Sequence, residues 1–420
     1  MNVLFTLNDK RMLHFFFYTD IFAEIYYFLI KNNKNIYILY DDKIKIDYLS
    51  NLYPKLIFIK KNKYSPVSKL DLIFSYPLDL NIMLKYFRKH YLFRKRMPLI
   101  SLKYIKNIIG IMSKKHFREI LNDISPYMIF LTSPTIPYEN LFAEYVYKYH
   151  KNIKIFCGTD GWDNYYYYKF NWKANYYLAW GYYDESLIKQ KYRVSNSNIV
   201  LTGIPYQKAL ENAYNQFKNL GEKDKIFGKG NKVIFFSSNN KIYIGDSEEM
   251  TIKLLIRDIK LKKLPWKILI RKLPSDASNY EEMESYYKRI KILGKDIVFF
   301  WDEIIKNKIY KNQIEEWGYL YNLVDVNVNL LSMAFLEARI CNIPCISYRD
   351  KNFNYPINNF EHLNYQMLLK EGLIEAEPSV LSNVLDDVLN NKERYLMKNF
   401  VKNFSYREKN VIKKLINCFK

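Results

Sequence analysis

The stretch N-L-L-S-M-A-F-L-E-A-R-I-C-N-I-P-C-I, from Asn329 to Ile346, predicts two strands joined by a helix. The run Val326–Leu331 has the apolar character of a buried strand and ends at the small polar residue Ser332. Four residues then recur at the helical spacings of three and four: Met333, Leu336, Glu337 and Ile340. Asn342 can close the helix because asparagine tolerates the left-handed backbone, and a second apolar run follows Pro344. Strand, helix and strand in this order form half of a nucleotide-binding α/β unit.

The predicted start of this helix suits a phosphorylated ligand. The first N–H groups of a helix have no partner within it, and the helix dipole adds partial positive charge there. A diphosphate is therefore expected at Ser332 and Met333. Glu337 lies about one and a half turns further on, where its carboxylate can accept two hydrogen bonds from a ribose diol. The alternative interpretation is an ordinary surface glutamate on a βαβ helix.

The pattern S-x-x-x-x-E-A-x-x-x-x-x-P resembles the donor-binding segment of GT-B glycosyltransferases. The matching residues are Ser332, Glu337, Ala338 and Pro344, with Asn342 where that family often has glycine. In the family the glutamate holds the ribose of a nucleotide sugar. The resemblance therefore implies that Ser332, Met333 and Glu337 bind a nucleotide-sugar donor.

The length of the chain favours two domains. Its 420 residues exceed one ordinary core, and a hydrophobic content of 49% excludes a disordered protein. Strands that alternate with helices predict α/β domains with parallel, doubly wound sheets, which agrees with the GT-B resemblance. We expect an acceptor-side Rossmann-like domain at 1–210, a polar linker at 211–230, a nucleotide-sugar domain at 231–395, and a C-terminal helix at 396–420 that crosses back to the first domain.

The cysteines argue against a metal centre. Cys157, Cys341, Cys345 and Cys418 form no C-x-x-C pair and no ligand cluster with the five histidines. We therefore expect no metal and no cofactor, with the nucleotide sugar as substrate. The apolar run Leu13–Ile30 carries Asp20 and Glu24, so it is not a membrane span, and no signal peptide is recognised at the amino end. These features predict a protein of the reducing cytoplasm.

Positive charge gathers in one part of the chain. The net charge is +22, and the range 51–120 holds 16 basic residues against three acidic ones. In its densest part, 84–118, basic residues alternate with apolar residues at helical spacing, as in helices that lie on anionic membranes. We expect peripheral attachment to the inner face of the plasma membrane. Nucleic acid is not expected as a partner, because the chain has no recognised motif for it, and a solvated lysine-rich face is the third interpretation.

Polar residues follow the predicted strands of the first half, at the edge where parallel sheets bind ligands. His14 lies just past the polar loop after the first strand and is a candidate catalyst or a packed histidine. In the turn G-T-D-G-W-D-N, Asp160 and Asp163 can act as general base, orient a hydroxyl group or cap a helix. Trp162 offers a flat apolar face to a sugar ring. A turn held by side-chain hydrogen bonds is the alternative interpretation.

A second set of motifs resembles one branch of the GT-B proteins, the bacterial surface-polysaccharide glycosyltransferases and relatives of the poly(glycerol phosphate) transferases. The matching motifs, in order, are Trp162-Asp163-Asn164, Lys169, Trp180-Gly181 and Thr202-Gly203-Ile204-Pro205. From this resemblance we assign Trp162 and Asn164 to contacts with the acceptor sugar. Gly203 is assigned to the donor.

Two strand ends of the second half carry the remaining donor candidates. Ser237 and Ser238 follow the apolar strand 232–236, and the strand 267–270 ends at Arg271-Lys272-Leu273-Pro274. Arg271, with Lys272 beside it, can hold a diphosphate in a bidentate grip. The tetrapeptide resembles the R-P-H-P motif of the same branch, but Leu273 replaces its histidine. Since leucine transfers no protons, the replacement favours glycosyl transfer over glycerophosphate transfer.

The sequence predicts a metal-independent glycosyltransferase that moves a sugar from a nucleotide donor to a surface glycan, such as capsule or lipopolysaccharide, or to a lipid-linked acceptor. The lack of a D-x-D motif agrees with GT-B chemistry, in which amides and basic side chains offset the leaving diphosphate. Two alternatives remain open. One is a sugar-nucleotide epimerase of the same double-Rossmann shape, and the other is a non-catalytic protein on a GT-B scaffold that binds membranes or nucleic acid.

Overall fold

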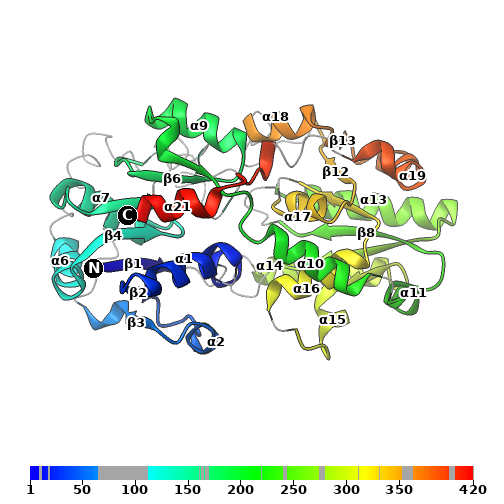
Figure 1. Cartoon of the computed structure of the whole chain (residues 1–420). Coiled ribbons are helices and arrows are strands. Elements are labelled where there is room, and N and C mark those ends of the chain that lie inside the picture. Colours follow the sequence, from blue (N-terminus) through cyan, green and yellow to red (C-terminus); the bar gives the residue numbers. More distant parts are fainter. Residues whose placement is uncertain are drawn as a thin grey trace, which may run out of the picture. The chain divides into compact units, whose positions relative to one another are not determined.

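The chain forms two compact units in a computed structural model. The first comprises residues 1–206 with 402–420, and the second comprises residues 207–401 (Figure 1). The structure describes residues 1–8, 12–17, 19–64, 112–159, 161, 165, 170–218, 220–239, 244–273, 280–310, 312–330, 332–351, 363–396 and 403–419.

The first unit is built on a parallel sheet of seven strands in the order β3-β2-β1-β4-β5-β6-β7. Their bounds are β1 Asn2–Leu7, β2 Asn35–Tyr40, β3 Leu56–Lys60, β4 Pro126–Leu131, β5 Lys154–Cys157, β6 Tyr176–Ala179 and β7 Ile199–Leu201. The connecting helices include α1 Asp20–Lys31, α2 Asp47–Leu52, α6 Met112–Ile124, α7 Pro137–Tyr149 and α9 Tyr182–Tyr192, with a short π-helix at Leu13–Phe17. The strands are almost wholly apolar because helices cover both faces of such a sheet.

The chain's abundant phenylalanines form the centre of this unit. The ring of Phe130 on β4 stacks on Phe5 of β1 at 5.0 Å and on Phe156 of β5 at 5.6 Å between centroids. Phe156 stacks in turn on Phe419, at 5.1 Å, near the end of the chain. Aromatic rings therefore join three neighbouring strands to the C-terminal helix.

The C-terminal segment belongs to the first unit. Its helix α21, Val411–Phe419, packs beside α1, and the hydroxyl of Tyr127 donates a hydrogen bond of 2.9 Å to the carbonyl of Phe419. Arg407 pairs with Asp20 at 2.7 Å. The carboxylate of Glu408 accepts a 2.8 Å hydrogen bond from the backbone N–H of Leu201. These contacts hold the segment against β7 and α1.

The second unit has a parallel sheet of six strands in the order β10-β9-β8-β11-β12-β13. The strands are β8 Lys232–Ser237, β9 Trp266–Arg271, β10 Val298–Phe300, β11 Val326–Asn329, β12 Cys345–Tyr348 and β13 Ile374–Ala376. The helices include α10 Gln207–Phe217, α11 Glu222–Phe227, α13 Ser247–Lys262, α14 Tyr280–Leu293, α15 Trp301–Ile305, α16 Gln313–Asn322, α17 Ala334–Ile340, α18 Leu363–Lys370 and α19 Leu381–Asn390. Two parallel α/β sheets confirm the predicted fold class.

The range 211–230, expected as a linker, contains structured elements of the second unit. Helix α10 and helix α11 occupy most of it, and α10 packs tightly on α16. The contact centres on Gly318, where a Cβ atom would come within 2.5 Å of the Cβ of Ala213. The segment is polar on its outer side, so its composition resembled a linker, whereas Ala213 and Phe227 on its inner side are buried.

No helix in the described ranges is long and apolar enough to cross a membrane. The basic stretch 84–118, expected to contact a membrane surface, lies outside the described residues.

Candidate functional site

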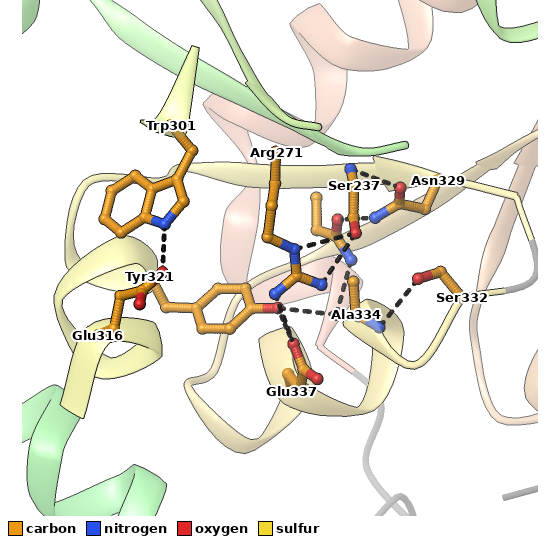
Figure 2. Close-up of polar contacts among 10 residues, drawn as sticks. Ser237, Arg271, Trp301, Glu316, Tyr321, Asn329, Ser332, Ala334 and Glu337 are labelled. Atoms are coloured by element: carbon orange, nitrogen blue, oxygen red, sulfur yellow. Dashed lines mark hydrogen bonds and ion pairs between the residues drawn. The ribbon is translucent and has the colours of Figure 1, made fainter. Parts of the chain in front are cut away.

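Three neighbouring strands of the second unit end at one group of polar side chains. Strands β9, β8 and β11 are adjacent in the sheet and end at Arg271, Ser237 and Asn329. Helix α17 follows β11 after a short turn and brings Glu337 to the same group (Figure 2). The predicted donor residues Ser237, Arg271 and Glu337 thus lie together at the carboxyl edge of a parallel sheet, where such sheets bind ligands.

Arg271 is fixed by hydrogen bonds and by aromatic rings. Its Nε and Nη2 atoms donate to the hydroxyl oxygen of Ser237 at 3.2 and 2.9 Å. The guanidinium carbon lies 5.7 Å from the ring centroid of Trp317 and 5.8 Å from that of Phe235, within range of cation–π attraction. About a fifth of the arginine side chain is exposed. The charged group is therefore held in place, and part of the side chain that carries it is exposed.

Glu337 is buried and already has partners within the protein. Its residue is only 2% exposed, and its Oε2 atom accepts a 2.7 Å hydrogen bond from the hydroxyl of Tyr321 on α16. The Nη1 atom of Arg271 lies 3.6 Å from the same oxygen, which is an ion pair without a hydrogen bond. Burial, followed by the charge of Glu337, raises the pKa of Tyr321 well above its ordinary value, so this hydroxyl keeps its proton and is the donor of the hydrogen bond.

The turn between β11 and α17 is longer than the sequence suggested, because β11 ends at Asn329. The helix begins at Ala334 instead of Ser332, and the Ser332 hydroxyl oxygen accepts a 3.2 Å hydrogen bond from the backbone N–H of Ala334. Met333 stands at the N-cap position and is partly exposed. The hydroxyl of Ser332 thus satisfies one of the N–H groups that were expected to face a diphosphate. Asn342 adopts the left-handed backbone at φ 56°, as its place after the helix predicted.

Two buried asparagines connect these parts, and sequence reasoning did not single them out. Asn329 accepts a 2.8 Å hydrogen bond from the backbone N–H of Ser237 and donates to the side-chain oxygen of Asn327. Asn327 donates in turn to the carbonyl of Ala334 at 2.9 Å. Both asparagines are at most 1% exposed. Their signal in the sequence was the alternation V-N-V-N in a strand predicted to be buried, since buried amides need partners.

Ser238 points to a second buried carboxylate that the sequence analysis also missed. Its hydroxyl donates to Oε1 of Glu248 at 2.7 Å, and the hydroxyl of Tyr286 donates to the same atom at 3.0 Å. The backbone N–H of Asn239 and the hydroxyl of Tyr348 donate to Oε2 at 3.2 and 3.4 Å. Burial raises the pKa of Glu248 although these hydrogen bonds act to lower it. Ser238 therefore anchors the loop after β8.

Lys272 makes contacts on the outer side of the same edge. Its Nζ atom pairs with Asp302 at 2.9 Å and lies 4.4 Å from the ring centroid of Phe300. The backbone N–H of the next residue, Leu273, donates to the hydroxyl of Tyr287 at 3.0 Å. Lys272 is thus directed to β10 and α15, and the structure does not join it to the contacts among Ser237, Arg271 and Glu337.

The expected catalytic and acceptor residues belong to the first unit. Asp160, Trp162, Asp163 and Asn164 lie outside the described residues. His14 is part of the π-helix Leu13–Phe17. Gly203, assigned to the donor, has φ +70° and packs against the C-terminal segment, where an added Cβ would lie 3.3 Å from the Cβ of Arg407.

The carboxyl edge of the first sheet carries a buried group around Glu139. This residue is fully buried at the start of α7, and its two carboxylate oxygens accept hydrogen bonds of 2.9 Å from the side chain of Asn8 and the backbone N–H of Ser133. The preceding residue, Tyr138, shares a 2.7 Å hydrogen bond with the ring of His116. Over the ranges that the structure describes, no three His, Cys, Asp or Glu residues come together as metal ligands.

Comparison with known proteins identifies the fold. No protein-family model matches the sequence, and no curated protein matches it. Among solved structures, a UDP-GlcNAc 2-epimerase from Neisseria meningitidis bound to UDP-GlcNAc aligns with a TM-score of 0.57 at 12% identity, covering 100% of this chain and 99% of that chain. The UDP-GlcNAc 2-epimerase of Methanocaldococcus jannaschii gives 0.56 at 12% identity, covering 100% and 99%. A glycosyltransferase from Rickettsia africae gives 0.51 at 11%, covering 100% and 97%. The chain has the two-domain α/β fold of the GT-B type.

Proposed function

We propose that this chain is an enzyme that uses a nucleotide sugar and that the group around Arg271 binds the nucleotide diphosphate. The observation that carries the proposal is the meeting of Ser237, Arg271 and Glu337 at the carboxyl edge of three adjacent parallel strands. A guanidinium group can bind two phosphate oxygens at once. In the similar epimerase from Neisseria meningitidis the bound molecule is UDP-GlcNAc, which is a ligand of this class.

A diphosphate would change the contacts of Arg271. In the structure the guanidinium group contacts Ser237 and faces the buried carboxylate of Glu337. Phosphate oxygens are stronger hydrogen-bond acceptors than a serine hydroxyl, so the diphosphate of a nucleotide sugar can bind the guanidinium group in place of the serine. Ser237 and the turn at Ser332 and Met333 then lie beside the diphosphate. Glu337, kept in position by its hydrogen bond with Tyr321, would bind the ribose.

The reaction that we propose is glycosyl transfer without a metal ion. The positive charge of Arg271 at the end of β9 would offset the charge that develops on the leaving diphosphate, and Lys272 would contribute only if it left Asp302. Asp163 or Asp160 would act as base or orient the acceptor hydroxyl, with His14 as a further candidate. Trp162 and Asn164 would contact the acceptor sugar.

The acceptor that we propose is a growing surface glycan or a lipid-linked precursor of one. The basic stretch 84–118 would hold the enzyme at the anionic inner face of the plasma membrane, where such acceptors are made. This location also agrees with the chain's net charge of +22.

Epimerisation of a nucleotide sugar is the second candidate function. It is favoured by the solved structures at a TM-score of 0.56 to 0.57, which are UDP-GlcNAc 2-epimerases. An epimerase must remove and return a proton on the sugar, which requires acid and base groups facing it. Glu139 is a buried carboxylate at the edge of the first sheet, and its two oxygens already accept hydrogen bonds from Asn8 and Ser133.

Product analysis separates the functions. Purified protein is incubated with UDP-, GDP-, CDP- and CMP-sugars, with and without a bacterial membrane extract as a source of acceptor, and the products are read by mass spectrometry and ion-exchange chromatography. A transferase releases free nucleotide only when acceptor is present, whereas an epimerase converts the sugar without it. Arg271→Ala should abolish either activity, and Arg257→Ala, an exposed arginine on α13, serves as the matched control. Turnover of no donor under any condition would refute the proposed function.

A further inference from the structure

Large aliphatic side chains are exposed where two helices of the second unit end. Leu261 near the end of α13 is 75% exposed, and Ile292 and Leu293 at the end of α14 are 82% and 41% exposed. Single exposed aliphatic residues are common, but a group of them on one surface marks a binding surface. The two helix ends that carry these residues lie side by side.

Two contacts join the end of α13 to the end of α14. The Nζ atom of Lys260 donates a 2.8 Å hydrogen bond to the carbonyl of Leu293. At Gly294 an added Cβ would lie 3.0 Å from Cδ1 of Ile256, so the end of α14 rests directly on α13. The residues 260–263 and 292–295 consequently form one surface, which we call the lysine tip.

The lysine tip is strongly basic. From Lys260 to Lys267 the chain carries four lysines and no acidic residue, and residues 260–263 are all exposed. Lys295 adds another exposed positive charge at the end of α14. Asp296 is the acidic residue next to it, and Lys267 donates to its backbone carbonyl at 2.7 Å. Aliphatic side chains surrounded by lysines are the composition of surfaces that enter the headgroup layer of anionic membranes.

The lysine tip lies at the opposite edge of the sheet from the candidate site. It directly precedes β9 and β10, so it belongs to the amino edge, whereas Ser237 and Arg271 end β8 and β9 at the carboxyl edge. A partner that covers the tip would therefore leave the donor-binding edge of this unit open.

We propose that the lysine tip docks on an anionic lipid bilayer, with Leu261 and Ile292 among the acyl chains and the lysines at the phosphate groups. Lysine stems can lie along the apolar layer while their ammonium groups reach the headgroups. A second copy of the chain fits less well, because two such tips would repel each other. Nucleic acid also fits less well, since the tip presents no exposed aromatic side chain on which a base can stack. This docking would add to any contact made by residues 84–118.

A fluorescent probe on Leu261 tests the proposal directly. The four native cysteines are buried, so a Leu261→Cys variant can be labelled selectively with the polarity-sensitive dye nitrobenzoxadiazole. The full-length protein is mixed with phosphatidylcholine vesicles, with or without one part in three of phosphatidylglycerol. We expect a blue shift and increased emission with the anionic vesicles alone. The matched control is Ile309→Cys, because Ile309 is fully exposed elsewhere in the same unit, and its probe should not respond.

Charge reversal supplies the second measurement. In vesicle sedimentation, Lys263→Glu with Lys295→Glu should weaken binding to anionic vesicles by at least about tenfold, because each lysine near such a surface contributes roughly 1 kcal/mol. Lys208→Glu on α10 is the matched control. The proposal is overturned if the protein sediments with anionic vesicles while the emission of the probe at position 261 does not change, since another surface would then bind the vesicles. It is also overturned if the tip variants alter self-association or RNA binding and leave vesicle binding unchanged.

Discussion

Replacement of Tyr321 by phenylalanine should destabilise the second unit by about 2 kcal/mol. The Tyr321 hydroxyl donates to Glu337 at 2.7 Å, and both residues are at most 2% exposed. A hydrogen bond to a charged group contributes about 1.5–3 kcal/mol to stability. The Nη1 atom of Arg271 lies 3.6 Å from the same oxygen, too far to replace the hydrogen bond. The methylene and ring contacts remain, so the loss reports the hydroxyl alone.

Urea unfolding and scanning calorimetry measure this loss. For a unit of this size, about 2 kcal/mol corresponds to a fall in Tm of roughly 4–8 °C. Tyr27→Phe is the matched control, because Tyr27 is 62% exposed and its hydroxyl should contribute nothing measurable. A double-mutant cycle with Glu337→Gln should give a coupling of about 1 kcal/mol, since a neutral acceptor forms the weaker hydrogen bond. Equal losses for Tyr321→Phe and Tyr27→Phe would refute the reasoning.

Three further predictions concern other parts of the two units. Hydrogen bonds from Arg289 hold the pKa of Glu249 at about 2, below the ordinary 4.5, so its carboxylate stabilises the folded protein above pH 4.5 and this stability is lost as the pH falls through about 2. Glu249→Gln should therefore lower the free energy of unfolding by about 1 kcal/mol at pH 7, as measured by urea unfolding. The difference between variant and wild type should narrow below pH 4.5, and a difference that stays constant with pH would show that the ion pair contributes nothing. Asn329→Leu should cost about 1–3 kcal/mol and weaken nucleotide binding, because it leaves the buried N–H of Ser237 without its acceptor; unchanged calorimetric titrations would contradict this. Gly181→Ala should free the C-terminal segment for limited proteolysis, because its Cβ would overlap the backbone of Asn403, and wild-type resistance would show that the segment is held elsewhere.

The fold was predictable because it depends on local patterns. Apolar runs such as Lys232–Phe236 gave strands, and the residue after α17, Asn342, closed its helix in the left-handed conformation as expected. The same reasoning failed at 211–230, where a polar outer side concealed the close contact of α10 with α16. Spacing along the chain does not report which helices touch.

Sequence reasoning chose three of the residues that the structure brings together at the candidate site, but it did not find their partners. Ser237 and Arg271 could be chosen because each lies at a predicted strand end, and Glu337 because of its place in the predicted helix and in the pattern that resembles the GT-B donor segment. Their contacts depend on residues distant in the sequence, such as Tyr321, which is 16 positions before Glu337. In the sequence Asn329 looks like an ordinary polar residue, and its role as a hydrogen-bonding partner becomes visible only when the strand is known to be buried. Register and burial decide these contacts, and both arise only when the sheet has formed.

The most direct test of the account is calorimetric titration of the purified protein with UDP, GDP, CDP and CMP in the absence of metal ions. We predict that one nucleotide binds and that Arg271→Ala weakens its binding by roughly 10- to 150-fold, which corresponds to the 1.5–3 kcal/mol of hydrogen bonds to a charged group. Glu337→Ala should weaken binding of the same nucleotide, and Arg257→Ala, with 58% of its side chain exposed on α13, should leave it unchanged. If no nucleotide binds, or if Arg271→Ala binds as tightly as the wild type, the donor site is not at this strand edge.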